Sequence, residues 1–338
     1  MSARDYGVLA DGVTNDLAGL QAAINYCAAN EKELALPEGE IVLQSGLTIP
    51  SGGAIHIRGA EAGTQGTRLV IKANAPIITV AAGQQATIEN VGFIGEMNAA
   101  KALQSGVYLN NCNNVNIRHC TLDSLYDSVV MLDTVFYSQI VDCRFFQVVR
   151  NQIRGTGTSG SGYAIRVSGC QVTSNVGTGT DVFYFENAGS LQFSDLMASP
   201  ATSTGRCLRI VSNAAASGIH QFDNCVFEGS AQEVCRIEGN PGAPIKHVYF
   251  SNCDFIQSGA GGGRRYYPAQ LRVYLVRQQH DLRNRSGRFH CRRLQGDSVR
   301  EFRFSRLLHA CSFQGARVSG DHAAKHRQPE PRGHHAVP

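Results

Sequence analysis

A short motif of hydrophobic and polar residues, named the cysteine phrase, recurs between residues 86 and 255. The phrase runs apolar, any, apolar, two spacers, cysteine, any, apolar, and residues 115–122 (VNIRHCTL) show it in full. Successive cysteine positions lie 23 to 31 residues apart. Repeats of roughly 20–50 residues are typical of stacked repeat architectures, so the pattern predicts a solenoid. The cysteine position is filled by Val91, Cys120, Cys143, Cys170, Ser194, Cys225 and Cys253.

The spacing inside each repeat predicts strands rather than helices. Apolar residues alternate at period two on both sides of the two spacers, which indicates two strands joined by a tight bend. One coil therefore contains about three short strands, and stacking coils at about 4.8 Å builds one continuous core. The fold class predicted is all-β, a single-stranded parallel β-helix. A second alternating run precedes each phrase, for example at residues 107–109, 130–132, 182–185, 208–210 and 235–237.

Cysteine usage supports a buried, reduced interior. Five of the 11 cysteines share the repeated position, and free cysteine is among the most buried residue types. We therefore expect a ladder of unlinked thiols rather than disulfides. We also expect no signal peptide in this chain, because no charged start followed by an apolar segment opens it, and no run is apolar enough to cross a membrane.

The amino-terminal segment adds a cap to the solenoid. Residues 5–16 read DYGVLADGVTND, and apolar residues at helical spacing then predict a helix over 17–28. Asp16 is expected to cap this helix by accepting an amide hydrogen bond. A strand ending in Pro37-Glu38-Gly39 follows. This opening resembles that of the pectate-lyase-like superfamily, closely over residues 5–60 and by coil pattern to about residue 258.

The resemblance implies a right-handed parallel β-helix with an N-terminal capping helix. It also implies a carbohydrate-active protein, because the superfamily includes pectate lyases, polygalacturonases and bacteriophage tailspike depolymerases. The reduced interior and the expected lack of a secretion signal favour the tailspike branch: a glycoside hydrolase that cleaves a bacterial surface polysaccharide, a homotrimer, and a place in the phage virion or outside the cell. A pectate-type lyase or polygalacturonase, and a non-catalytic carbohydrate-binding or structural solenoid, remain alternatives.

Candidate catalytic residues follow from the columns that stacked strands would form. The outward residues of the second run are Tyr108, Met131, Gln152, Tyr184, Arg209 and Arg236, and just beyond them lie Asn110, Asp133, Arg154, Glu186, Val211 and Glu238. Asp133 and Glu186 would then lie two coils apart, about 10 Å. This separation is near the upper end of the range for the two carboxyl groups of an inverting glycosidase. Each carboxylate has a simpler interpretation as a solvated polar position.

The same face offers groups that would bind a sugar chain. Tyr108 and Tyr184 can stack on sugar rings, and Arg154, Arg209 and Arg236 can hold an acidic polysaccharide. Asp123, Tyr126 and Asp127 form a further acidic and aromatic group. We expect no metal site and no cofactor, although a lyase would need calcium held by carboxylates and an arginine or lysine as base.

The charge composition of the chain changes, and its repeat pattern ends, near residue 261. Residues 1–263 carry 15 basic and 22 acidic side chains, whereas residues 264–338 carry 16 and five, with seven of the 11 histidines. A basic arm binding nucleic acid is one interpretation. The tail has only one lysine, Lys325, and no repeat, which favours the other interpretation, a GC-rich gene translated in a wrong frame; nucleic acid is therefore not an expected partner. The predicted organisation is a cap (1–45), coils (46–260) and an irregular basic tail (261–338).

Overall fold

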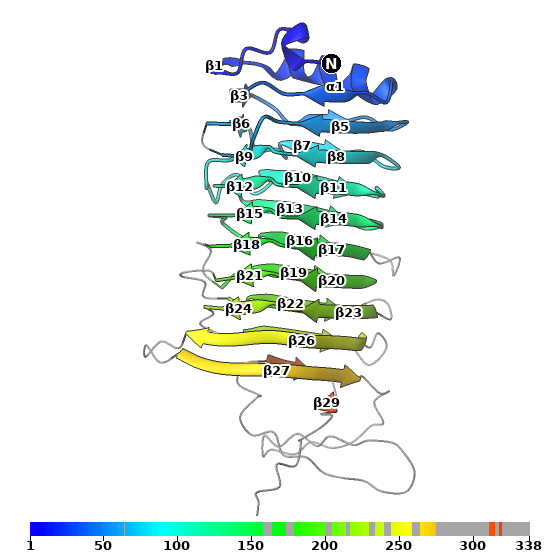
Figure 1. The fold of residues 1–338 in the computed structure, drawn as a ribbon, viewed down its shortest axis with the longest axis vertical. Coiled ribbons are helices and arrows are strands. Elements are labelled where there is room, and N and C mark those ends of the chain that lie inside the picture. The colour runs from blue at the N-terminus through cyan, green and yellow to red at the C-terminus, as the bar shows by residue number, and fades with distance from the viewer. Residues whose placement is uncertain are drawn as a thin grey trace, which may run out of the picture.

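The computed structural model of the chain describes residues 1–63, 65–157, 164–173, 179–199, 205–213, 217–229, 234–239, 245–258, 264–274, 311–314 and 318–319. Its strands stack as successive coils along one axis (Figure 1). Strands of neighbouring coils pair in parallel, and the fold is the predicted right-handed, single-stranded parallel β-helix. Each regular coil contributes a long strand, a short strand and a third strand, as the phrase indicates.

The third strands form one continuous parallel sheet, called sheet B here. Its strands pair in the order of the coils, so residues one coil apart become neighbours. The strands are β4 (Leu47–Ile49), β7 (Ile78–Val80), β10 (Ser105–Asn110), β13 (Asp127–Leu132), β16 (Ile153–Thr156), β19 (Phe183–Glu186), β22 (Leu208–Ser212), β25 (Cys235–Gly239) and β28 (Cys311–Gln314).

The long and short strands form a second, bent sheet, called sheet A here. The long strands are β2 (Glu33–Ala35), β5 (Ala54–Arg58), β8 (Gln85–Glu89), β11 (Val115–Arg118), β14 (Ser138–Val141), β17 (Ala164–Ser168), β20 (Ser190–Ser194), β23 (Ser217–Asp223) and β26 (Ile245–Ser258). The short strands are β1 (Asp11–Asn15), β3 (Gly39–Leu43), β6 (Thr67–Ile71), β9 (Gly92–Ile94), β12 (Thr121–Asp123), β15 (Arg144–Phe145), β18 (Gln171–Val172), β21 (Met197–Ala198) and β24 (Val226–Glu228).

The cysteine phrase produces a regular corner between long and short strands. From β8 to β24 this corner always consists of two residues, of which the first adopts a left-handed conformation and the second points into the core. Asparagine, aspartate and glycine adopt that conformation at low cost, which explains their frequency in the second spacer. The left-handed residues are Asn90 (φ 58°), His119 (50°), Asp142 (52°), Gly169 (64°), Asp195 (52°), Asn224 (51°) and Asn252 (51°), the last inside β26.

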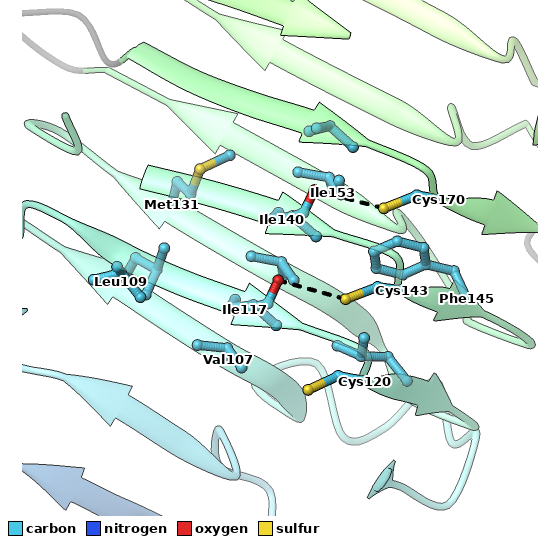
Figure 2. Close-up of a cluster of buried hydrophobic side chains, with 14 of the residues drawn as sticks. Val107, Leu109, Ile117, Cys120, Met131, Ile140, Cys143, Phe145, Ile153 and Cys170 are labelled. Atoms are coloured by element: carbon cyan, nitrogen blue, oxygen red, sulfur yellow. Dashed lines mark hydrogen bonds between the residues drawn. The ribbon is translucent and has the colours of Figure 1, made fainter. Parts of the chain in front are cut away.

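The cysteines form the predicted column inside the solenoid. Figure 2 shows Cys120, Cys143 and Cys170 on successive coils among aliphatic side chains. Their thiols donate hydrogen bonds to carbonyl oxygens two residues earlier, at 3.1, 3.3 and 3.3 Å. Burial raises the pKa of Cys143 well above its usual range, so this thiol keeps its proton. The nine cysteines whose side chains are described are all buried and unlinked.

One assignment in this column was wrong. The amide of Met197 donates to the carbonyl of Cys170 (3.0 Å), and the amide of Val226 donates to the carbonyl of Leu196 (2.8 Å). Leu196, and not Ser194, therefore occupies the cysteine position in its coil. Ser194 pairs with Asp223 at the end of the long strand. The sequence interpretation matched a small residue and missed that a larger leucine fills the same space.

Replacing Cys143 with valine is expected to change the free energy of unfolding by less than about 1.5 kcal/mol, because volume-conserving core substitutions are well tolerated. Val91 already fills this position in an earlier coil. Cys143→Asp, which places a carboxylate among apolar side chains, should cost more than about 3 kcal/mol. Urea unfolding of both variants measures the difference, and equal losses would argue against an apolar role for the column.

The amino-terminal cap comprises a short 3-10 helix η1 (Ala3–Tyr6) and helix α1 (Leu17–Ala29), at the blue end of the stack in Figure 1. Asp16 stands at the N-cap of α1, but its side chain makes no capping hydrogen bond. Its carboxylate instead accepts from the amides of Leu9 (2.8 Å) and Ala10 (3.0 Å). The expected capping role was therefore wrong, because the preceding turn competes for the same oxygens. Buried Asp16 fixes the turn that leads into β1.

The other end of the solenoid departs from the coil pattern. β26 pairs in parallel with both β23 and β24, and its free edge pairs antiparallel with β27 (Arg264–Tyr274), which also pairs with β29 (Val318–Ser319). The backbone of β28 pairs in parallel with β25. The cysteine phrase does not recur in these described strands, and the rest of the predicted tail lies outside the described residues. Within the described ranges, no helix has the length and apolar character needed to cross a membrane.

Candidate functional site

The outward face of sheet B carries one column of large polar side chains. Strand pairing aligns Tyr108, Val130, Arg154, Tyr184, Arg209 and Arg236. The prediction for this column was correct for Tyr108, Tyr184, Arg209 and Arg236. It was wrong for Met131 and Gln152, which are both buried. The four consecutive apolar residues at 129–132 show no alternation, so the predicted phase of β13 was shifted by one residue.

A second column lies two residues further along each strand. It contains Asn110, Leu132, Thr156, Glu186, Val211 and Glu238. Arg154 was expected here and belongs to the first column instead.

Asp133 was also expected in the second column, but it follows Leu132. It has a left-handed backbone (φ 55°), and its amide donates to the carbonyl of Thr156 (2.9 Å). Asp133 and Glu186 therefore do not share a column, whereas Glu186 and Glu238 do. Val211 lies between these two glutamates, which are separated by two strand spacings, about 9.6 Å.

Asp127 organises the amino-terminal part of this face. Its carboxylate accepts from the side chain of Arg150 (3.0 Å) and the amide of Asn151 (3.0 Å), and it lies 3.4 Å from Nε of Arg154. Asp127 is buried, so these pairs are shielded from solvent. The guanidinium of Arg150 also lies 4.8 Å from the centre of the Tyr126 ring. The Asp127 group thus fixes Arg154 in the first column.

Tyr108 lies close to two charges of opposite sign. Burial raises the pKa of its hydroxyl, the positive charge of Arg154 lowers it, and the negative charge of Asp133 raises it. Strand register places Tyr108 and Arg154 in one column on either side of Val130, and Asp133 directly follows β13, the strand between them. Two of the predicted substrate-binding residues and one predicted catalytic residue are therefore brought together.

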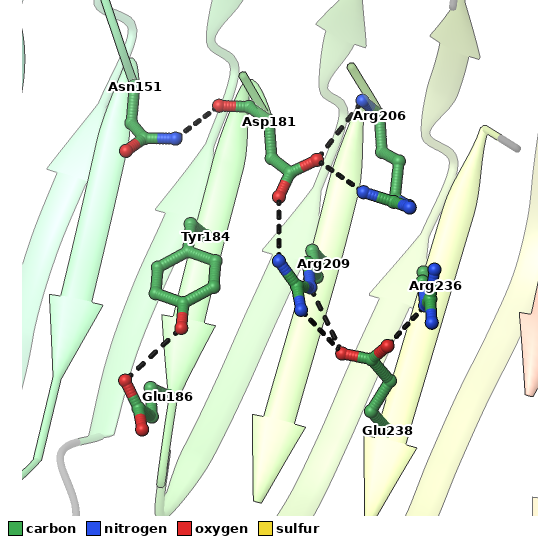
Figure 3. Close-up of polar contacts among 8 residues, drawn as sticks. All are labelled: Asn151, Asp181, Tyr184, Glu186, Arg206, Arg209, Arg236 and Glu238. Carbon is green, nitrogen blue, oxygen red and sulfur yellow. Dashed lines mark hydrogen bonds and ion pairs between the residues drawn. The ribbon is translucent and has the colours of Figure 1, made fainter. Parts of the chain in front are cut away.

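Asp181 organises the next part of the face (Figure 3). Its carboxylate lies 3.3 Å from Nη1 of Arg206 and 3.8 Å from Nη1 of Arg209. Burial raises the pKa of Asp181, and the two arginines offset part of that increase. The side chain of Asn151 donates to the backbone carbonyl of Asp181, which links this group to the Asp127 group.

Arg209 connects Asp181 to Glu238. Its Nε and Nη2 donate to one oxygen of Glu238 at 3.1 and 2.8 Å, and Arg236 pairs with the other oxygen (Figure 3). Burial lowers the pKa of Arg209, but Glu238 and Asp181 raise it by more, and the net change is upward. Arg209 therefore holds its proton and does not fit the base that a lyase requires.

Glu186 has a different environment from Glu238. The hydroxyl of Tyr184 donates to one of its oxygens (3.1 Å), and the side-chain amide of Asn213 donates to the other (2.7 Å). Burial and the charge of Glu186 raise the pKa of Tyr184 to about 12, so its hydroxyl keeps the proton that it donates. The guanidinium of Arg209 lies 5.6 Å from the Tyr184 ring centre. Two neutral side chains, Tyr184 and Asn213, thus donate to Glu186, whereas two arginines pair with Glu238.

The described residues do not fit a calcium site. In the described ranges, no three His, Cys, Asp or Glu side chains are grouped so that they could hold a metal ion. Asp127, Asp181 and Glu238 are each bonded to arginine side chains that would repel a divalent cation. No step of a reaction is therefore derived through calcium.

Sequence reasoning did not propose Arg150, Asp181 or Arg206. A signal was available, because opposite charges one coil period apart become neighbours in a parallel solenoid. Asp127 and Arg150 are 23 residues apart, Asp181 and Arg206 are 25, and Arg209 and Glu238 are 29. All three separations match the spacing of the cysteine phrase.

Comparison with known proteins gives similar solved structures but no matching protein family or curated sequence. The ORF18 protein of Geobacillus virus E2 is 12% identical with a TM-score of 0.48, covering 85% of this chain and 65% of that one. The A-module of the Azotobacter vinelandii mannuronan C-5 epimerase AlgE4 is 14% identical with a TM-score of 0.47, covering 75% and 76%. The phiAB6 tailspike, in complex with oligosaccharides of Acinetobacter baumannii surface polysaccharide, is 13% identical with a TM-score of 0.47, covering 86% and 60%. The chain thus spans less than two thirds of the two phage proteins.

Proposed function

We propose that this protein binds an acidic bacterial surface polysaccharide along the outward face of sheet B and hydrolyses its glycosidic bonds, as a tailspike-type depolymerase. The observation that carries the proposal is the unbroken run of arginines, tyrosines and carboxylates over the strands β16, β19, β22 and β25. A homotrimer in a virion or outside the cell is part of the same proposal, taken from the family resemblance.

Substrate binding is assigned to the first column. Arg154, Arg209 and Arg236 are half-buried, and their guanidinium groups are oriented by Asp127 and Glu238. A guanidinium held in this way can still offer its remaining N–H groups to the carboxylate of a sugar acid. Because these side chains repeat at the strand spacing, they suit an extended chain better than a single small molecule.

Cleavage is assigned to Glu186 with one partner carboxylate. Glu186, to which Tyr184 and Asn213 donate, would protonate the leaving glycosidic oxygen. Glu238, whose negative charge two arginines stabilise, would take a proton from the attacking water, and one water is consumed for each bond broken. Their separation of about 9.6 Å by strand spacing suits inversion at the anomeric carbon. Asp133, in the turn after β13, is the alternative partner.

A non-catalytic binding solenoid is the second candidate. It is favoured by the ion pairs of Asp127, Asp181 and Glu238, since a carboxylate engaged by arginines often has only a structural role. The pectate-type lyase is less favoured, because Arg209 holds its proton and the described residues do not fit calcium.

The test is incubation with purified acidic capsular polysaccharides, read out by viscosity and by product mass. Hydrolysis is expected to lower the viscosity and to yield oligosaccharides heavier by one water than the corresponding lyase products. Proton NMR of the first products is expected to show inverted anomeric configuration. Binding with unchanged polymer length would favour the second candidate, and absorbance from an unsaturated product would favour the lyase.

A further inference from the structure

The geometry points to a separate carbohydrate subsite at Tyr137, where the ring stacks on one hexopyranose unit of the bound chain. Tyr137 lies on the connection between β13 and β14 and is 75% exposed. It is not part of the charged columns of sheet B. The inference rests on the proposed binding of a polysaccharide and adds a position that this function did not assign.

The backbone of Tyr137 is held in a conformation that disfavours tyrosine. Its φ is +53°, in the left-handed region that bulky residues rarely adopt. The position one coil earlier is Asn114, which has φ +55° and is a residue type that tolerates this conformation. The fold alone would therefore be served better by asparagine at 137. Strain retained at an exposed residue indicates that the side chain has a use.

Hydrogen bonds to both neighbouring coils hold the backbone that carries the ring. The amide of Phe136 donates to the carbonyl of Cys112 (3.3 Å), and its carbonyl accepts from the amide of Asn114 (3.0 Å). On the other side, the amide of Ala164 donates to the carbonyl of Val135 (2.9 Å). Both neighbouring coils thus pin this turn. Because the backbone of this turn is already ordered, little backbone conformational entropy is lost when a ligand binds to the ring.

The surroundings fit a sugar better than an apolar partner. Asp133 opens the same turn, the amide of Thr134 donates to the side chain of Asn111 (3.4 Å), and Asn114 stands at the matching position one coil earlier, so polar residues share this turn with Tyr137 and with Phe136, whose ring centre lies 6.3 Å from that of Tyr137. A pyranose presents a face of C–H groups to an aromatic ring and hydroxyl groups at its rim, which carboxylate and amide groups can bind. The turn also lies at the end of β13, the same end of sheet B at which Glu186 closes β19 two coils further on.

The absence of tryptophan from the sequence gives a direct test. Tyr137→Trp introduces a single tryptophan, whose emission is measured while hyaluronate, polygalacturonate, alginate or neutral dextran is added. Calorimetry with the same polymers compares the wild type with Tyr137→Phe and Tyr137→Asn. We expect the tryptophan emission to change with at least one polymer. Tyr137→Asn should lower affinity for it about fivefold to tenfold, whereas Tyr137→Phe should stay within about twofold.

Thermal unfolding separates loss of the ring from loss of the fold. Tyr137→Asn should unfold at an equal or higher temperature than the wild type, because asparagine relieves the left-handed strain. If a polymer binds the wild type, but the tryptophan does not respond and Tyr137→Asn binds normally, the subsite is refuted and the proposed function stands. If the tryptophan responds to neutral dextran alone, the subsite stands and the proposed acidic substrate is refuted. If the wild type shows no binding by calorimetry and the tryptophan emission does not change with any of the four polymers, both the subsite and the proposed function are refuted.

Discussion

Replacing Glu186 with glutamine is expected to lower the rate of polysaccharide cleavage about a thousandfold, within the range measured for removal of a general acid. Glutamine keeps the shape of the side chain: its oxygen can accept from Asn213, and its NH2 group can donate to the hydroxyl oxygen of Tyr184, so the outward surface of sheet B and the affinity for polymer should change little. The rate is measured as reducing ends released per unit time from the polysaccharide that the wild type cleaves. The affinity is measured in parallel by co-sedimentation.

The partner of Glu186 is identified by two further variants. Glu238→Gln should abolish cleavage to a similar extent if the carboxylates that share a column form the pair, whereas Asp133→Asn should do so if the pair is the one predicted from the sequence. Glu38→Gln, at an exposed turn in the cap, is the control and should cleave normally. Full activity of Glu186→Gln would exclude Glu186 from the reaction. Retained activity in both partner variants would exclude a two-carboxylate mechanism on this face.

Acidification is expected to destabilise the protein through His220. This residue of β23 is fully buried between Leu191 and Val248 of the neighbouring coils, and burial lowers its pKa from 6.5 to about 3. The unfolded chain therefore binds a proton on His220 below pH 6.5, whereas the folded protein does not until about pH 3. Stability from this group is complete above pH 6.5 and falls as the pH drops towards 3, by about 1.4 kcal/mol per pH unit and about 5 kcal/mol in all.

The measurement compares the free energy of urea unfolding of the wild type and His220→Leu at pH 7 and pH 4. Because leucine cannot bind a proton, the variant should gain about 3 kcal/mol relative to the wild type between these two pH values. Other titrating groups affect both proteins equally and cancel in the difference. A pH-independent difference for His220→Leu would show that His220 is solvated or already protonated.

The fold could be predicted because its rule is local and repeated. Each copy of the phrase specifies a strand, a corner and a strand, and the corner recurs because one left-handed residue and one small core residue satisfy it. The assignment of Leu196 was missed because it fills the same corner position with a larger side chain than cysteine. The capping prediction for Asp16 failed because the amides of the preceding turn and those of the helix start compete for its carboxylate. Local sequence does not show which of them binds it.

The site could be predicted only in part. Its prediction requires knowing which residues of each strand point outward, and some strands lack the alternation of apolar and polar residues that would show this. Tyr184 and Glu186 lie on β19, where buried phenylalanines alternate with the two outward residues, and both were placed in the correct column. Asp133 was misplaced because residues 129–132 are all apolar and permit two phases. Asp127 and Asp181 lie just before the alternating runs and are buried by arginines from other coils, which no single coil reveals.

The constant two-residue corner also bears on which parts of the chain can accept insertions and deletions. Coils differ in length, yet from β8 to β24 the connection between long and short strands never does. The strands vary somewhat in length, but the connections on either side of sheet B vary most, from three residues (187–189) to ten (173–182). These connections border the face that carries Arg154, Tyr184 and Glu186. Insertions and deletions can therefore remodel the borders of this proposed binding face while the packing of the interior is inherited unchanged.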